Sequence, residues 1–350
     1  MRHMRALVNT AVDPGRVPAP SSEARAFHEG MAGYRPTPVR DLPGVARELG
    51  LDAVGLKDES DRLGLPAFKV LGASWAVEQA LRERPDVRTL VAASAGNHGR
   101  AVAHVAALRG LHARIFLPGR STPGRREAIA GEGAEVVVVD GAYEDAVAAA
   151  AEAAAQPDAI EIADIGDSSP ARWVIDGYHT LFAEAGAQAA HDLILVPVGC
   201  GSLAAAAARH GAAIGAAVVG VEPVTAACLT ASIDAGEPTA VATPGTTMAG
   251  LDCAEISPSA WPTLRHGMRG MDTVSDAETH AAMRGLAAQG LEIGDCGAAT
   301  LAALEALASE GECSDLRRAV GLGSETRVLL VATEGASDPE GYRRIVSRPG

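Results

Sequence analysis

The chain has 350 residues, of which 47% are apolar and 21% are charged, so it is long enough for one large or two medium domains with their own cores. Its formal net charge of −14 at pH 7 repels nucleic-acid phosphates and anionic membranes alike. Aromatic residues make up only 3%, too few to provide stacking surfaces for bases. The composition therefore favours a protein that acts on small molecules, with neither nucleic acid nor membrane as a partner.

Cysteine usage and the N-terminal segment indicate the compartment. The five cysteines are scattered without CxxC spacing, at Cys200, Cys228, Cys253, Cys296 and Cys313. An odd number with no metal-ligand spacing is typical of a reducing compartment and gives no metal site. The first twenty residues, MRHMRALVNTAVDPGRVPAP, contain no apolar run long enough for a signal peptide, and no stretch of the chain approaches a membrane span. We therefore expect a cytoplasmic protein.

Lysine is almost absent from the sequence. Of the thirty Lys and Arg residues, only Lys57 and Lys69 are lysines. Arginine serves for most charge contacts, but its guanidinium stays protonated and cannot attack a carbonyl as a free amine does. Lys69, in GLPAFKVLGASWA (residues 64–76), is the candidate nucleophile. We place Lys57, in GLKDES, at the end of a strand with a structural or distant electrostatic role. On composition alone, chance survival of both lysines is an equal alternative.

From residue 87 onward, short apolar runs alternate with alanine-rich segments of helical length. The runs that we predict to be strands are 89–94, 113–118, 135–140, 159–164, 192–199, 217–223 and 327–335. Continuous apolar strands separated by helices are typical of parallel sheets that are covered on both faces. The sequence therefore predicts an α/β fold with open, twisted and mostly parallel sheets.

Ligands bind such sheets beyond the carboxyl ends of the strands. Three loops occupy that position: ASAGNHG (93–99), VGCGS (198–202) and ATEG (332–335). The first carries Ser94, Asn97 and His98 where a helix begins. Its N–H groups suit a carboxylate, and Asn97 offers an amide to a polar ring substituent. Taken singly, Ser94 or Asn97 is more often a helix N-cap, and His98 a packed or surface histidine.

The stretch VPVGCGSLAAAAARH indicates a strand, a glycine turn and a helix. Gly199 and Gly201 let backbone N–H groups converge, and Ser202 adds a hydroxyl at the helix N-terminus, which together make an anion cradle. The loop lacks the Lys-Ser/Thr ending of an NTPase P-loop and the third glycine of a dinucleotide fingerprint. A small monophosphate therefore fits better than a nucleotide. On this motif alone, a tight turn without a ligand is an equal alternative.

Thr333 presents a hydroxyl at a strand end, where it can meet a ring nitrogen, although without context an ordinary strand terminus is the preferred explanation. Lys69, the glycine turn, Asn97 and Thr333 together indicate one kind of cofactor. A nucleophilic lysine, a phosphate cradle, an amide for a phenolic oxygen and a hydroxyl for a pyridine nitrogen are the contacts that pyridoxal phosphate needs. They predict pyridoxal 5'-phosphate as the cofactor, joined to Lys69 as a Schiff base.

Five motifs carry a resemblance to known proteins: GLPAFKVLGASWA around Lys69, GNHGR at 96–100, TTMAGLDC at 246–253, WPTL at 261–264 and TEGASDPEGY at 333–342. With these motifs the chain resembles the fold-type II pyridoxal-phosphate enzymes, the tryptophan synthase β-like family. Within that family it is most similar to the diaminopropionate ammonia-lyases. The likeness extends from about residue 25 to the end, which is nearly the whole chain.

The resemblance implies roles for particular residues. Lys69 holds the cofactor, Asn97 contacts its phenolic oxygen and Thr333 faces its ring nitrogen. A hydroxyl at the ring nitrogen leaves the pyridine less protonated than a carboxylate would, which favours β-elimination over transamination. The phosphate-binding residues are Gly199, Cys200, Gly201 and Ser202, and the candidate substrate-binding residues are Ser94, Ala95, Gly96 and His98.

The resemblance also implies an architecture of two open, mostly parallel sheets with helices on both faces. A smaller domain, residues 85–185, is expected to be inserted into a larger one made of residues 1–84 and 186–350. The cofactor is expected between the two domains, and the assembly is expected to be a homodimer.

The chain departs from these relatives at positions that bear on the substrate. Ala95 stands directly before GNHG, where the lyases usually have an acidic residue implied in handling D-substrates and the second amino group. In this respect SAGNH resembles the serine/threonine dehydratases. Asp164 is the candidate for a second acidic catalytic residue expected after the fourth strand of the series. The segment EIGDCGAATLAAL (292–304) replaces a Glu/Ser-rich turn near the cofactor.

The sequence therefore predicts a pyridoxal-phosphate-dependent ammonia-lyase. It would catalyse β-elimination from 2,3-diaminopropionate or a related β-substituted L-amino acid, giving a 2-oxo acid and ammonia, with Lys69 as the base. A serine or threonine dehydratase and a β-replacement synthase are the alternatives among enzymes. A non-catalytic pyridoxal-phosphate-binding protein is a third hypothesis. A nucleotide-binding oxidoreductase is disfavoured, because the dinucleotide glycine pattern is absent.

Overall fold

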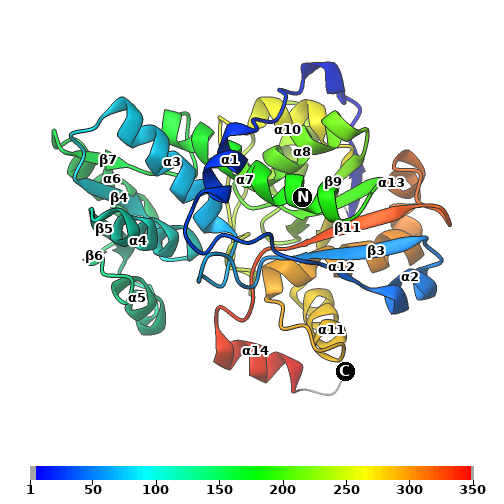
Figure 1. Ribbon diagram of the computed structural model, residues 1–350. Helices are drawn as coiled ribbons and strands as arrows, with labels where there is room; N and C mark the ends of the chain where they lie inside the picture. The colour runs from blue at the N-terminus through cyan, green and yellow to red at the C-terminus, as the bar shows by residue number, and fades with distance from the viewer. Residues whose placement is uncertain (1–4, 348–350) are drawn as a thin grey trace.

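The computed structural model describes residues 5–347, which form two lobes (Figure 1). The strands are β1 (Ala6–Val8), β2 (Val39–Asp41), β3 (Ala53–Asp58), β4 (Thr89–Ala93), β5 (His112–Pro118), β6 (Glu135–Val139), β7 (Ala159–Glu161), β8 (Leu193–Pro197), β9 (Ala217–Pro223), β10 (Gly270–Val274) and β11 (Arg327–Ala332). The helices are α1 (Glu23–Glu29), α2 (Pro43–Leu49), α3 (Lys69–Glu83), α4 (Asn97–Arg109), α5 (Pro123–Ala130), α6 (Tyr143–Ala154), α7 (Ser169–Gln188), α8 (Ser202–Ile214), α9 (Cys228–Ala235), α10 (Trp261–Gly267), α11 (Asp276–Ala287), α12 (Asp295–Ser309), α13 (Ser314–Ala319) and α14 (Pro339–Val346), with short 3₁₀ turns at Pro14–Arg16 and Gly311–Cys313. Over the described residues, no helix combines the length and the apolar character needed to cross a membrane.

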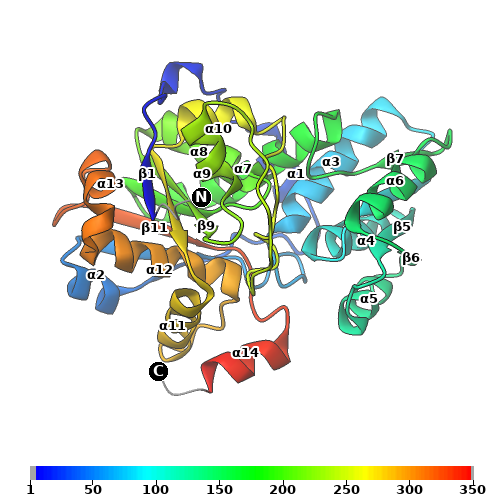
Figure 2. The same cartoon turned by 180° about the vertical axis from the view of Figure 1, so that it is seen from behind.

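The larger sheet has seven strands in the order β1-β10-β9-β8-β11-β3-β2. Its inner strands are parallel, and only the edge strands β1 and β2 pair antiparallel with their neighbours. Figure 2 shows β1 on the side of the larger lobe that faces away from α4, α5 and α6. Every residue of β8 is buried, because helices cover both faces of the sheet. The smaller sheet, β6-β5-β4-β7, is parallel throughout. The predicted α/β class with two mostly parallel sheets is confirmed.

All seven predicted strands are present. β7 ends at Glu161 and β11 at Ala332, earlier than predicted, because the residues that follow leave the sheets to form loops. Lys57 lies on β3 near its carboxyl end, as predicted. The apolar pattern did not predict β1, β2 or β10. The first two are three-residue edge strands, and β10 places the carboxylate of Asp272 in the core.

The smaller sheet lies in the chain between β3 and β8, so the larger sheet takes strands from both sides of it. Figure 1 shows the smaller sheet with α4, α5 and α6 as one lobe, and α3 and α7 between the lobes. This arrangement supports the proposal of an inserted domain at residues 85–185. Its boundary stays a prediction, since α7 packs against both α3 and α8.

Helices α3 and α7 approach each other closely at two glycines. A Cβ on Gly72 would lie 2.5 Å from a ring carbon of Tyr178, and a Cβ on Gly177 would lie 2.6 Å from the Leu71 carbonyl oxygen. Side chains in a packed interior cannot be this close, so any larger residue at either position would push the helices apart. The contact fixes Lys69, the first residue of α3, relative to the loop that precedes α7.

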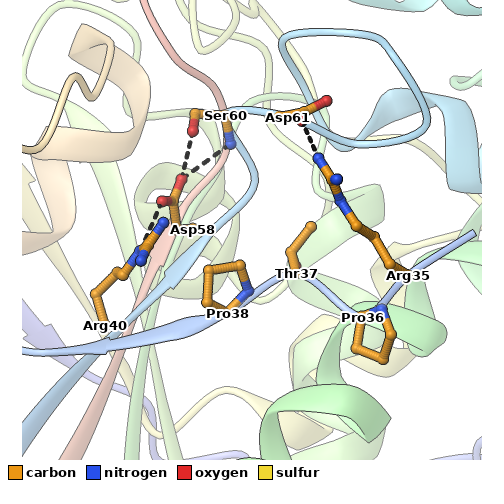
Figure 3. Close-up of a pocket in the computed structure, with 8 residues that line it drawn as sticks. All are labelled: Arg35, Pro36, Thr37, Pro38, Arg40, Asp58, Ser60 and Asp61. Atoms are coloured by element: carbon orange, nitrogen blue, oxygen red, sulfur yellow. Dashed lines mark hydrogen bonds and ion pairs between the residues drawn. The ribbon is translucent and has the colours of Figure 1, made fainter.

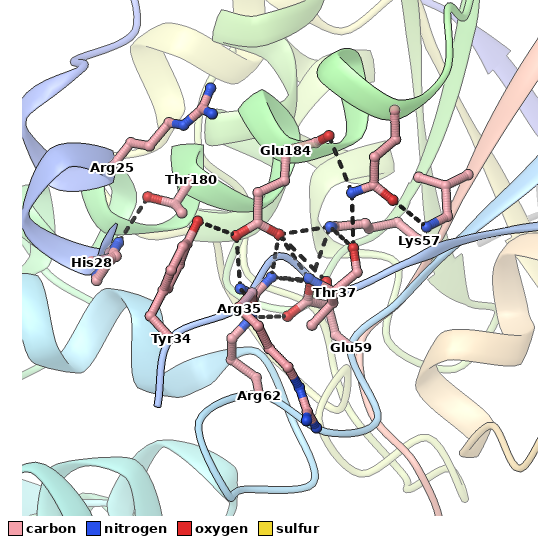
Figure 4. Close-up of polar contacts among 12 residues, drawn as sticks. Arg25, His28, Tyr34, Arg35, Thr37, Lys57, Glu59, Arg62, Thr180 and Glu184 are labelled. Carbon is pink, nitrogen blue, oxygen red and sulfur yellow. Dashed lines mark hydrogen bonds and ion pairs between the residues drawn. The ribbon is translucent and has the colours of Figure 1, made fainter. Parts of the chain in front are cut away.

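A buried charge network clamps the opposite end of α7 to the loop that leads to Lys69 (Figure 4). Arg62 donates to both oxygens of Glu184 at 2.7 Å and to Glu59 at 2.6 and 2.8 Å. Lys57 Nζ donates to Glu184 and to the Thr37 carbonyl oxygen, each at 2.7 Å. The four charged side chains are almost completely buried, and their two positive and two negative charges balance. This contact pattern agrees with the structural role predicted for Lys57.

We expect Glu184→Ala to lower the free energy of unfolding by about 3–5 kcal/mol, because it leaves Lys57 and Arg62 buried without their shared carboxylate. Glu78→Ala is the matched control, since it removes ion pairs to Arg82 and Arg109 at the surface and should cost less than about 1 kcal/mol. Urea unfolding followed by circular dichroism measures both. Equal losses in the two variants would contradict the clamp.

Three buried histidines, His179, His191 and His210, pack together between α7, α8 and the loop before β8. The Nε2 atoms of His191 and His210 are 3.2 Å apart. Burial lowers the pKa of His210 to about 3 and that of His179 to about 4. The unfolded chain therefore binds protons below pH 6.5 that the folded chain does not, so acid reduces stability.

The lowered pKa of His210 predicts how the free energy of unfolding depends on pH. Stability should be complete above pH 6.5 and should fall as the pH decreases, by roughly 2–3 kcal/mol for His210 alone between pH 6.5 and 4.5. His210→Gln should flatten this slope in denaturant titrations across the range. A slope that is unchanged in the variant would show that His210 is not held neutral.

Candidate active site

Lys69 and Asp164 form an ion pair, with Lys69 Nζ 2.7 Å from Asp164 Oδ2. Asp164 lies in the loop between β7 and α7, so the packing of α3 on α7 brings the two side chains together. His98, in the first turn of α4, donates from Nε2 to the Ile162 carbonyl oxygen at 2.7 Å. Its Nδ1 has no hydrogen-bond partner among the described residues and lies 3.7 Å from Asp164 Oδ2. Lysine, carboxylate and histidine thus share one site.

The ion pair sets the charges of this site. Burial disfavours the charged amine, but the Asp164 carboxylate outweighs it and raises the pKa of Lys69 above its usual range. Burial likewise opposes the charged form of Asp164, yet the neighbouring His98 and Lys69 side chains lower the pKa of that carboxyl. Burial lowers the pKa of His98, so its ring is neutral at pH 7. Because Nε2 donates to a carbonyl, Nδ1 is left as an acceptor that faces Asp164.

The glycine turn of residues 199–202 connects β8 to α8 beside this pair. Gly201 has φ = +93°, which favours glycine, and a Cβ on Gly199 would lie 2.6 Å from the Gly250 carbonyl oxygen. Ser202 donates its hydroxyl to the Asp164 carbonyl oxygen at 2.8 Å, and Cys200 Sγ lies 3.6 Å from the same oxygen. The first turn of α8 leaves backbone N–H groups without intrahelical partners. The predicted anion cradle is therefore adjacent to Lys69 and Asp164.

The end of β11 forms another wall of the site. Thr333 is buried, and its hydroxyl has no hydrogen-bond partner among residues 5–347. Its carbonyl oxygen accepts from the N–H of Phe68, the residue before Lys69. Asn97, the first residue of α4, donates its side-chain amide to Glu334 Oε2 at 2.9 Å. The loops that carry Lys69, Asn97 and Thr333 are therefore joined directly.

The loop predicted to bind substrate turns tightly between β4 and α4. Ser94 Oγ accepts from the N–H of Gly96 at 3.3 Å. A Cβ on Gly99 would lie 2.1 Å from the Ser94 carbonyl oxygen, so glycine is required there. Ala95 is half-buried against the main core. Residues 94–96 therefore form a short loop that leads directly into the first turn of α4, where His98 lies beside Asp164.

The structure also places residues at the site that the sequence reasoning did not select. The Tyr178 ring lies 5.8 Å from Lys69 Nζ. Asp295, Cys296 and Glu334 have ligand atoms within 4.8 Å of one another, and burial with the nearby charge of Glu334 raises the pKa of Asp295 to about 7. Glu334 stands next to Thr333 in the TEG motif, so its position in the sequence was a usable signal. Tyr178 had none, because it reaches the site from the middle of α7.

Two cavities lie near these loops. One, of about 280 Å³, is shown in Figure 3 and contains none of the predicted site residues. Its arginines already have partners, since Arg35 pairs with Asp61, and Arg40 Nε lies 3.2 Å from Asp58. The other, of about 190 Å³, is lined by both His98 and Asp164. Of these two cavities, the second therefore adjoins the Lys69–Asp164 pair and the first does not.

Comparison with known proteins agrees with this geometry. The profile of the family described as pyridoxal-phosphate dependent enzymes matches residues 31–334. The chain belongs to this family. The diaminopropionate ammonia-lyase of Escherichia coli strain K12 is 32% identical over 359 aligned residues, which cover 92% of this chain and 90% of the relative. The biosynthetic L-threonine dehydratase of Corynebacterium glutamicum is 33% identical over 58% of this chain. The crystal structure of the Escherichia coli diaminopropionate ammonia lyase with an aminoacrylate-PLP azomethine reaction intermediate matches with a TM-score of 0.89 and 30% identity, covering 98% of this chain and 96% of that one.

The site of this pyridoxal-phosphate-dependent enzyme fits its cofactor on observations from this chain alone. The buried hydroxyl of Thr333, which has no partner among the described residues, suits the ring nitrogen of the cofactor. The turn at Gly199 and Gly201 leaves room for a phosphate that a Cβ at either glycine would fill. The amine of Lys69 lies beside that turn, near Asp164 and Ser202. The cofactor that the sequence predicted is confirmed by the family. The contacts of individual residues with it stay predictions.

We expect Lys69→Ala to abolish turnover and the visible absorption band of the lysine-bound cofactor. Lys69→Arg should do the same, because a guanidinium keeps the charge beside Asp164 but cannot bond to a carbonyl. Borohydride reduction followed by peptide mass spectrometry can decide between only two lysines. A pyridoxyl group on Lys57 instead of Lys69 would show that the assignment is wrong.

Proposed function

We propose that the protein is a β-eliminating ammonia-lyase that acts on 2,3-diaminopropionate or a related β-substituted L-amino acid and yields a 2-oxo acid and ammonia. The observation that carries the proposal is the Lys69–Asp164 pair, set beside an anion cradle in a chain with near full-length likeness to diaminopropionate ammonia-lyases. With diaminopropionate, the substrate and one water would give pyruvate and two ammonia molecules.

In this proposal Lys69 holds the cofactor, the turn at residues 199–202 holds its phosphate, and Thr333 meets its ring nitrogen. When bound, pyridoxal phosphate supplies an electron sink next to the α-carbon. The substrate carboxylate would bind the N–H groups of residues 94–98. Lys69 Nζ would take the α-proton while the β-ammonium leaves as neutral ammonia, and Asp164 Oδ2, 2.7 Å away, would accept a proton from the Lys69 amine.

The two-lobed architecture supports a role for closure. We propose that residues 85–185 move toward the larger domain when substrate binds and exclude water from the reacting atoms. The five free thiols support function in a reducing cytoplasm. The family likeness supports a homodimer.

A serine or threonine dehydratase is the second candidate. Ala95 in SAGNH favours it, and L-threonine dehydratases are among the relatives, although they match a smaller part of this chain than the ammonia-lyases do. A dehydratase releases one ammonia for each 2-oxo acid, whereas elimination from diaminopropionate releases two. The stoichiometry therefore separates the candidates.

The decisive experiment is a substrate panel of L- and D-2,3-diaminopropionate, L-serine and L-threonine. Release of 2-oxo acid and of ammonia is measured for each, with Lys69→Ala as the control for background hydrolysis. We expect the highest kcat/KM with L-2,3-diaminopropionate and two ammonia molecules for each pyruvate. A higher kcat/KM for L-serine or L-threonine would replace the proposal with the dehydratase.

Handedness gives a separate prediction. Lys69 and Asp164 are in direct contact, which places both on one side of the substrate, and Ala95 cannot accept a proton. We expect strong preference for the L-enantiomer and at most weak activity on D-2,3-diaminopropionate. Ala95→Asp should raise kcat/KM for the D-form roughly 10–100-fold by supplying a base.

The same assay tests Asp164 as an alternative base. Asp164→Asn should reduce turnover of the L-form, because Lys69 loses the group that accepts its proton. Equal native rates on both enantiomers would disprove the preference. Selective loss of activity on the D-form in Asp164→Asn would identify Asp164 as the base for that enantiomer.

A further inference from the structure

The cavity of about 190 Å³ beside Asp164 is lined by residues of β4, α4, α6, β7 and the loop before α7. Ala159 of β7 packs with Ala146 and Ala150 of α6, and Glu161 lies two residues further along the same strand. Side chains two apart share one face of a strand, so Glu161 is directed toward α6. Tyr143, the first residue of α6, lines the cavity and donates its hydroxyl to the Ala93 carbonyl oxygen at 3.3 Å.

The charges that line this cavity do not balance. Asp164 is neutralised by Lys69 at 2.7 Å, and His98 is a neutral acceptor. Glu161 is half-buried, and among residues 5–347 its carboxylate has neither a hydrogen bond nor an ion pair. Burial raises the pKa of Glu161, the expected effect on a carboxylate that lacks a cation. Burial and the charges of Asp164 and Glu161 also raise the pKa of Tyr143, which keeps its hydroxyl protonated. The cavity therefore has one uncompensated negative charge.

A second, independent observation also points to a missing ligand. His98 is 4% exposed, lines the same cavity, and leaves Nδ1 as an acceptor without a donor. Buried acceptors in folded proteins are nearly always paired, so the arrangement lacks a hydrogen-bond donor on this side of Asp164. A group that carries positive charge and N–H donors would satisfy both Glu161 and His98.

We propose that this cavity binds the side-chain ammonium group of the substrate, and that Glu161 makes the enzyme prefer amino acids with such a group. The inference deepens the proposed ammonia-lyase function and rests on it. The β-nitrogen of 2,3-diaminopropionate is two bonds from the α-carbon, about 2.5 Å at ordinary bond lengths, so it must lie close to Lys69. The cavity begins at Asp164, in direct contact with Lys69, and therefore lies where that nitrogen would be.

Glu161 replaces, in this scheme, the carboxylate that Ala95 cannot supply. Serine and threonine place a neutral hydroxyl where diaminopropionate places an ammonium, and they gain little from an additional negative charge. In a partly buried site, attraction between a carboxylate and an ammonium several ångströms apart is sufficient to change the dissociation constant about tenfold. Glu161 is thus a specificity-determining residue rather than a proton carrier.

The test compares Glu161→Gln with the native holoenzyme. We expect KM for L-2,3-diaminopropionate to rise roughly tenfold, with KM for L-serine or β-chloro-L-alanine changing less than about twofold. Glu161→Asp should retain part of the preference. Glu144→Gln is the matched control, because it removes the same charge from an exposed position in the first turn of α6, outside the cavity. It should leave both KM values unchanged.

A binding measurement makes the test independent of turnover. In the Lys69→Arg background, which keeps the positive charge beside Asp164, isothermal titration should show that Glu161→Gln weakens binding of L-2,3-diaminopropionate roughly tenfold and leaves binding of L-serine unchanged. Equal effects on both ligands, or no effect on either, would overturn the inference. Failure of the native enzyme to release ammonia from diaminopropionate would instead overturn the proposed function, and the titration would still decide whether the cavity prefers an ammonium group.

Discussion

The close packing of α3 against α7 is the constraint on which the rest of the site depends. Lys69 begins α3, and Asp164 lies in the loop before α7, so a 2.7 Å contact between their side chains requires the helices to be fixed in register. Gly72 and Gly177 allow the backbones to approach within distances that any Cβ would prevent. A displacement of about 1 Å at this contact would be sufficient to disrupt a proton transfer between the two groups.

Two groups of buried charges lie along α7, one at each end of the helix. The charges cancel in the first group, whereas the second group has an excess negative charge. Near its carboxyl end, Lys57, Glu59, Arg62 and Glu184 cancel one another and satisfy their hydrogen bonds, so the network holds the loop to Lys69 without reactivity. Near its start, the Lys69–Asp164 pair is balanced, but the adjoining cavity adds the lone charge of Glu161. The first region suits rigidity and the second suits a cationic ligand.

Much of the architecture could be predicted from local patterns. Continuous apolar runs identified the inner parallel strands, because burial on both faces leaves no polar alternation. The edge strands β1 and β2 were missed for the converse reason, since three residues that are half-exposed or exposed carry no periodic signal. Glu334 belongs to the TEG motif, but the motif did not predict a place for it in the site. Its contact with Asn97 joins residues more than two hundred positions apart, which no local pattern reports.

The sequence by itself determined the chemistry of the protein. A chain with only two lysines, a glycine turn before a helix and a threonine at a strand end carries the contacts for pyridoxal phosphate, because each requires a particular residue type at a particular position. Only the tertiary structure decided which groups face one another. The partner of Lys69, the neutral state of His98 and the unpaired charge of Glu161 depend on burial and distances of a few ångströms, and these are set by the packing of separate elements.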